Sequence, residues 1–159
     1  MSTKRTIKVK NYLNIFEEFE AAAAITPGML VKQTSATEVA VHSTEDGNAI
    51  PMFAIEDELQ GKEKTEAYAH EDRVQVWIPQ RGDIVNAIAE DGEDIAVGDF
   101  VTSAGNGKVK KYVAVEFGDS PSDAGVVNPL SIIGQAVEAK DMSGSSGVDP
   151  DPYIEIRIV

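Results

Sequence analysis

The 159-residue chain contains no cysteine, which excludes disulfide bonds, thiol nucleophiles and zinc–thiolate sites. It also lacks any apolar run near the length of a membrane span, and its first residues hold no apolar stretch like that of a signal peptide. We therefore expect neither a membrane partner nor export by that route. Aromatic residues make up only 6% of the chain, so the core has to be built mainly from Val, Ile and Ala.

Basic residues are in the minority, with 14 Lys and Arg against 27 Asp and Glu, and the net charge is −13. A field of this sign repels nucleic acid, so we expect no nucleic-acid partner. The charge is uneven, because residues 1–10 carry Lys4, Arg5, Lys8 and Lys10 and no acid. A basic arm on an acidic body suits contact with an acidic patch on a partner, and these four residues are candidate partner-binding residues. The alternative is a frayed terminus that its charges keep soluble.

Motifs for catalysis or metal binding are missing as well. The only histidines, His42 and His70, have no convergent ligand spacing around them, and we expect both to be exposed polar residues. The acidic clusters at residues 56–58 and 90–94 do not follow the EF-hand pattern and are typical of solvated loops. Residues 105–108 lack the remaining positions of a P-loop. The sequence therefore predicts a protein that is not an enzyme, with no cofactor and no metal.

Many short segments of alternating polarity, separated by turn residues, predict an all-β fold, either a small β-barrel or a jelly-roll-like sandwich. Residues 14–24 fit a helix or a strand equally well, and residues 56–71 are expected to form a long exposed loop. The clearest predicted strands cover residues 4–10, 29–33, 38–42, 73–78, 83–89, 99–103, 108–115, 130–139 and 153–159.

Trp77 stands out in the alternating segment 73–78. Val74, Val76 and Ile78 share one face of this predicted strand, and Trp77 lies on the other. A tryptophan there belongs either to a second core layer or to an interface. We favour the interface, because Trp is enriched among binding hot spots.

Two segments of the chain are alike. Residues 25–31 read Ile-Thr-Pro-Gly-Met-Leu-Val, and residues 95–101 read Ile-Ala-Val-Gly-Asp-Phe-Val. Each is followed by a turn and a second predicted strand, at residues 38–42 and 108–113. This pattern indicates two hairpins that each begin at a tight glycine turn.

These segments carry a resemblance to a known family. Residues 21–31, with four alanines before Ile-Thr-Pro-Gly-Met-Leu-Val, resemble the opening motif of tailed-phage capsid cement (head decoration) proteins. Residues 95–101, 103–108, 133–139 and 154–159 follow in the order that those proteins show. The resemblance covers most of the chain after residue 20, and its motifs are structural glycines and strands.

The resemblance implies a small β-barrel or β-tulip domain at residues 21–159 behind an extended N-terminal arm at residues 1–20. It also implies a homotrimer on the outer surface of the virion capsid, assembled in the host cytoplasm. Its partner would be the major capsid protein, whose neighbouring subunits it would bridge to stabilise the shell. The alternative function is a carbohydrate- or receptor-binding β-module of a virion appendage.

Overall fold

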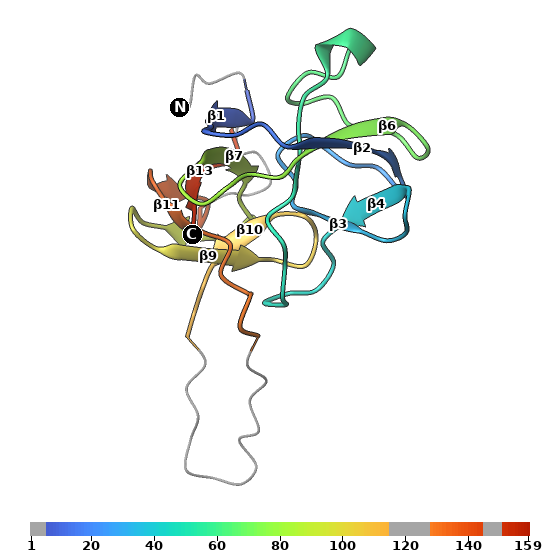
Figure 1. Ribbon diagram of the computed structural model, residues 1–159. Helices are drawn as coiled ribbons and strands as arrows, with labels where there is room; N and C mark the ends of the chain where they lie inside the picture. Colours follow the sequence, from blue (N-terminus) through green and yellow to red (C-terminus); the bar gives the residue numbers. More distant parts are fainter. Residues whose placement is uncertain (1–5, 115–127, 145–150) are drawn as a thin grey trace, which may run out of the picture.

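The computed structural model describes residues 6–114, 128–144 and 151–159, and it confirms the all-β class. Two larger sheets lie side by side, the six-stranded one on the left of Figure 1 and the five-stranded one on the right. Neither is a closed barrel, so the sandwich is the better of the two expected architectures.

The six-stranded sheet has the order β1 (Lys8–Lys10), β7 (Ile84–Ile88), β13 (Tyr153–Ile158), β11 (Gly134–Ala136), β9 (Phe100–Ser103) and β10 (Val109–Lys111). The order in the five-stranded sheet is β3 (Val31–Gln33), β4 (Glu38–Val41), β2 (Phe16–Ala21), β6 (Arg73–Trp77) and β5 (Phe53–Ala54). The smallest sheet pairs β8 (Asp94–Ile95) with β12 (Lys140–Asp141), and a short 3-10 helix, η1, covers Glu58–Gln60.

Strand β13 lies inside its sheet because both of its edges are used. It pairs with β7 on one side and β11 on the other, and all its pairings are antiparallel. Ile154, Ile156 and Ile158 are buried, as the alternation of the sequence predicts. The strong strand signal at the end of the chain therefore marks a central strand.

Residues 8–10 and 16–21, which belong to the expected arm or its boundary, are part of the sheets. Strand β1 pairs with β7, and β2 pairs with both β6 and β4, so the boundary expected at residue 20 falls inside β2. The ambiguous segment 14–24 contains a strand, because Phe19 and Ala21 alternate into the core while their neighbours face outward.

Two hydrophobic clusters form the core, and Met29 packs against both. Val74 and Val76 belong to the cluster of the five-stranded sheet, whereas Trp77 joins the other, which is built largely from the six-stranded sheet. Trp77 has 0% of its surface exposed. The surface position predicted for Trp77 is therefore wrong, because this end of β6 is covered on both faces.

The long loop expected at residues 56–71 is only partly exposed. Its first half holds η1, where Leu59 is 97% exposed. In its second half Tyr68 is fully buried, exchanges two backbone hydrogen bonds with Ile25, and donates its hydroxyl proton to the Ile55 carbonyl at 2.8 Å. The second half of the loop is thus anchored to the core by one aromatic side chain.

The two similar segments form the same turn. The Met29 N–H donates to the Thr26 carbonyl and the Asp99 N–H to the Ala96 carbonyl, both at 3.1 Å. Gly28 has φ +93° and Gly98 has φ +90°, a region that L side chains rarely adopt. Each turn leads into a hairpin, β3–β4 or β9–β10, so the predicted pattern is confirmed.

A ring of three backbone hydrogen bonds joins these two hairpins. The His42 N–H donates to the Leu30 carbonyl, the Gly107 N–H to the His42 carbonyl, and the Leu30 N–H to the Gly107 carbonyl, over 2.9, 3.0 and 2.7 Å. The start and end of the β3–β4 hairpin are thereby fixed to the turn of the β9–β10 hairpin.

The two turn glycines offer a matched test. In Gly98→Ala the new Cβ meets open space, so only the left-handed backbone is penalised, by about 1 kcal/mol. In Gly28→Ala the Cβ would also lie 2.7 Å from Tyr153 Cε1 and 3.1 Å from the Asn86 carbonyl oxygen. We expect a total loss of about 3 kcal/mol there, because overpacking adds to the same penalty. Urea unfolding of both variants measures the difference, and equal losses would contradict the packing role of Gly28.

Candidate functional site

The most distinctive exposed feature is a short apolar segment between β1 and the start of β2. Four of its large apolar side chains face solvent, with exposed fractions of 65% for Tyr12, 61% for Leu13 and 41% each for Ile15 and Phe16. Lys8 and Lys10 of β1 border it. We call Lys8, Lys10, Tyr12, Leu13, Ile15 and Phe16 together the N-terminal surface.

This surface is held in place by hydrogen bonds. The carboxylate of Asp83, which is 0% exposed, accepts the Tyr12 N–H through Oδ1 and the Gln80 N–H through Oδ2, both at 2.8 Å. Farther along, the Ile78 N–H donates to the Ile15 carbonyl at 2.9 Å. The apolar side chains are therefore exposed on a fixed backbone.

The two lysines lie over the aromatic rings of the segment. Lys8 Nζ is 4.5 Å from the centre of the Phe16 ring and donates to Asn14 Oδ1 at 3.3 Å, and Lys10 Nζ is 5.3 Å from the centre of the Tyr12 ring. Cation–π contacts of this kind keep a charge next to an apolar area. Of the predicted partner-binding residues, Lys8 and Lys10 thus lie together, and Lys4 and Arg5 lie outside the described residues. Trp77 is paired with Phe16 in the register of β2 and β6, but it is fully buried.

Sequence reasoning overlooked the apolar half of this surface. Its signal is two pairs of large apolar residues, Tyr12-Leu13 and Ile15-Phe16, between the lysines of β1 and the glutamates of β2. Residues 14–24 fit both a helix and a strand with one buried face, so the pattern does not indicate that Ile15 and Phe16 are exposed.

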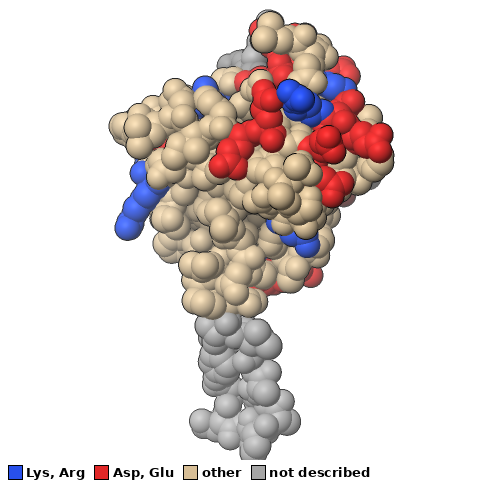
Figure 2. All heavy atoms as spheres, turned by 45° about the vertical axis from the view of Figure 1, so that its right-hand side comes forward, with Lys and Arg blue, Asp and Glu red and all other residues tan. Residues whose placement is uncertain are grey.

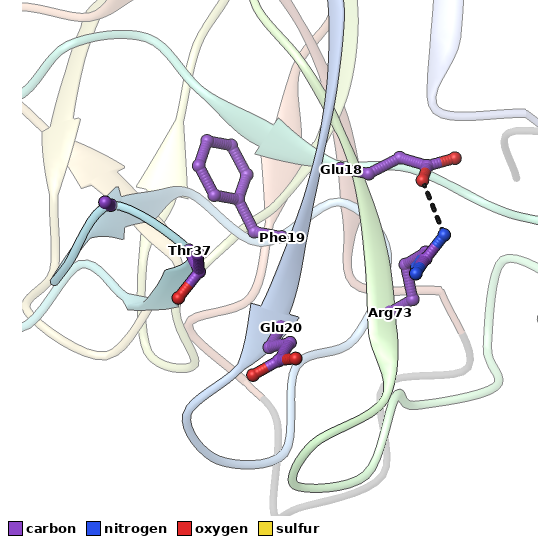
Figure 3. Close-up of a pocket in the computed structure, with 6 residues that line it drawn as sticks. Glu18, Phe19, Glu20, Thr37 and Arg73 are labelled. Carbon is purple, nitrogen blue, oxygen red and sulfur yellow. Dashed lines mark hydrogen bonds and ion pairs between the residues drawn. The ribbon is translucent and has the colours of Figure 1, made fainter.

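A shallow hollow of about 280 Å³ lies over strands β2 and β6 beside the turn before β4 (Figure 3). Glu18, Glu20 and Arg73 line it with the edge of Phe19 and with Thr37, whose carbonyl accepts the Glu20 N–H. Arg73 Nη1 lies 3.2 Å from Glu18 Oε2, and both side chains are more than half exposed. Exposed pairs of this kind contribute little to stability. The hollow therefore offers exposed charged groups.

His42 lies in the interior, which corrects the exposed position predicted for it. It is 4% exposed, with Nδ1 2.7 Å from Ser103 Oγ and Nε2 3.1 Å from the Asn48 carbonyl oxygen. Since a carbonyl only accepts, Nε2 carries a proton. His42 forms one wall of a cleft of about 350 Å³ beside the β3–β4 hairpin, but both of its ring nitrogens are already used within the fold. His70 is exposed, as predicted.

Neither a metal-binding cluster nor a membrane-spanning helix is found in residues 6–114, 128–144 and 151–159. Among them no three His, Asp or Glu side chains gather in a way that could hold a metal ion. No helix formed by these residues is long and apolar enough to cross a bilayer.

Comparison with known proteins gives one informative result. No family model and no curated protein matches the sequence. Among solved structures, the chain is similar to the head fiber gp8.5 N base of bacteriophage phi29, with a TM-score of 0.54 and 17% sequence identity. The match covers 92% of this chain and 95% of the other. At this identity the similarity concerns the fold.

The anchoring role of Asp83 can be tested against Asp99. Asn has one acceptor oxygen, so Asp83→Asn leaves one of the two partly buried N–H groups without its partner, and we expect a loss of about 1–3 kcal/mol. In Asp99→Asn a single oxygen can still accept the Ala96 N–H, and only the solvent-accessible pair with Lys111 is weakened. Urea unfolding with hydrogen exchange at the Tyr12 amide measures both effects. If the two variants behave alike, Asp83 does not hold the N-terminal surface.

Proposed function

We propose that this chain is a structural protein of a tailed-phage head, which binds the outer surface of the capsid and stabilises the shell by bridging major capsid subunits. The observation that carries the proposal is the similarity of fold, over nearly the whole length of both chains, to the base of a phage head fiber. The resemblance of the glycine turns and strands to cement proteins points to the same class of protein.

Charge supports an exterior position. A chain of net charge −13 would be repelled by packaged DNA, so it gains nothing from contact with the genome. On the outside of a shell the same charge favours solubility and discourages nonspecific binding to nucleic acid.

The mode of action follows from many small contacts. We propose that the protein acts as a homotrimer and that each copy adds a modest area of contact across a seam between capsid subunits. Many copies on one shell then oppose the pressure of the packaged genome together, because their contacts must be broken at many places for the shell to open.

Binding to heads tests the proposal. Heads that lack the protein are mixed with the purified chain, sedimented, and imaged by cryo-electron microscopy. We expect saturable binding at regular positions on the outer surface, and a higher temperature for DNA release from the decorated heads. An unrelated protein of similar size and net charge serves as the control.

Two results would count against the proposal. One is the absence of binding at regular capsid positions. The other is density confined to tail or appendage structures, accompanied by binding to glycans, which would favour the carbohydrate- or receptor-binding alternative.

A further inference from the structure

We propose that the N-terminal surface binds an acidic face on a second copy of this chain. The acidic strand face consists of Glu18 and Glu20 of β2 and Glu38 of β4, with Arg73 of β6 beside them. The inference names the contact within the proposed homo-oligomer and rests on that proposed function for its biological role. Its test uses the free protein alone.

The apolar part of the N-terminal surface is unusual for an isolated chain. Tyr12 and Leu13 are each more than 60% exposed, and Ile15 and Phe16, which follow after Asn14, are each 41% exposed. Monomeric proteins rarely expose large contiguous apolar patches, and such patches mark contact sites when polar groups surround them. The hydrogen bonds that the Asp83 carboxylate and the Ile15 carbonyl accept fix the backbone in advance, so little entropy is lost when a partner binds.

The charges at the rim of this surface indicate the kind of partner. Lys8 and Lys10 contact aromatic rings and, in the part of the chain that the structure describes, neither pairs with a carboxylate. Two cations beside an apolar segment are complementary to a surface on which acidic side chains outnumber basic ones.

This chain carries such a surface. Glu20 and Glu38 are direct neighbours in the parallel pairing of β2 and β4, so two like charges lie side by side. Arg73 faces Glu20 across the β2–β6 pairing and forms an ion pair with Glu18, which leaves three acidic side chains to one cation. Like charges opposite each other on a sheet are destabilising. Figure 2 shows acidic side chains clustered on the upper part of the face turned to the viewer, with fewer Lys and Arg among them. Cations from a second copy would offset this repulsion.

The two surfaces share strand β2 but cannot meet within one copy. Phe16, Glu18 and Glu20 lie on the same side of β2, since alternate residues of a strand point the same way, and Phe19 is buried on the other side. The cationic, apolar surface is therefore at the start of the strand and the acidic face at its end. Contact between them has to be head-to-tail between copies, and such contacts form a ring when the rotation from one copy to the next closes.

Charge exchange tests this contact. Lys8→Glu with Lys10→Glu reverses one surface, Glu20→Lys with Glu38→Lys reverses the other, and Leu13→Ser removes apolar contact. Sedimentation and light scattering over a range of concentrations measure self-association. We expect each change to weaken it at least tenfold, and the chain with all four charge reversals to associate with itself again but not with the unchanged chain.

Control variants separate these effects from general changes of charge or stability. Leu59→Ser alters an apolar residue that is 97% exposed on η1, and Lys32→Glu reverses a charge on β3. We expect neither to change self-association, and thermal unfolding confirms that each variant folds. The variant with all four charge reversals excludes misfolding as the cause of weaker self-association, because a misfolded protein would not regain a specific contact.

Three outcomes would overturn the inference. The unchanged chain could remain monomeric at every concentration, or it could associate equally well with either surface altered. It could also be monomeric and lose head binding on Leu13→Ser, in which case the N-terminal surface docks on the shell. A chain that forms rings but fails to bind heads would contradict the proposed function and leave this inference intact.

Discussion

The ring of hydrogen bonds among Leu30, His42 and Gly107 is the contact on which the arrangement of the two sheets depends. It joins the hairpin of one sheet to the hairpin of the other through backbone groups alone, so it survives most changes of side chain. The His42 ring adds a bond to Ser103 and another to Asn48, which brings a third segment of the chain to the same junction. The protein has no disulfide bonds. These buried hydrogen bonds, which lie between the two apolar clusters, hold the two sheets together instead.

The position of the N-terminal surface depends on how this junction arranges the two sheets. Strand β1 belongs to one sheet and β2 to the other, so the exposed segment between them spans the boundary. Its backbone is tied to the first sheet through Asp83 and to the end of β6 through Ile15. Any shift of one sheet against the other would move Lys8 relative to Phe16, and the fixed relation of cation and ring would be lost.

The sequence predicted what depends on neighbouring residues and missed what depends on distant ones. Strand β13 and the two glycine turns follow from alternation and from local backbone preference, which act over a few residues. Trp77 and His42 were misplaced for a different reason. For Trp77, alternation separates the two faces of the strand but does not show what covers each face. For His42, the hydrogen-bond partner Ser103 is 61 residues away in the sequence. The lysines of β1 were found from charge alone, whereas the apolar residues beside them became meaningful only once their exposure was known.

Net charge and local charge have opposite effects on an assembly of this chain. At −13, copies repel one another at long range, and added salt screens that repulsion over a Debye length of about 8 Å at physiological ionic strength. Contacts between a lysine and a glutamate at the edge of an apolar patch are shorter and are partly shielded from salt. Self-association that rises with moderate salt therefore fits an apolar contact opposed by the repulsion between the net charges of the copies. An assembly held by ion pairs alone would become weaker as salt is added. The arrangement of Lys8 and Lys10 over aromatic rings places both kinds of force in one surface, and the proposed contact between copies would draw on both.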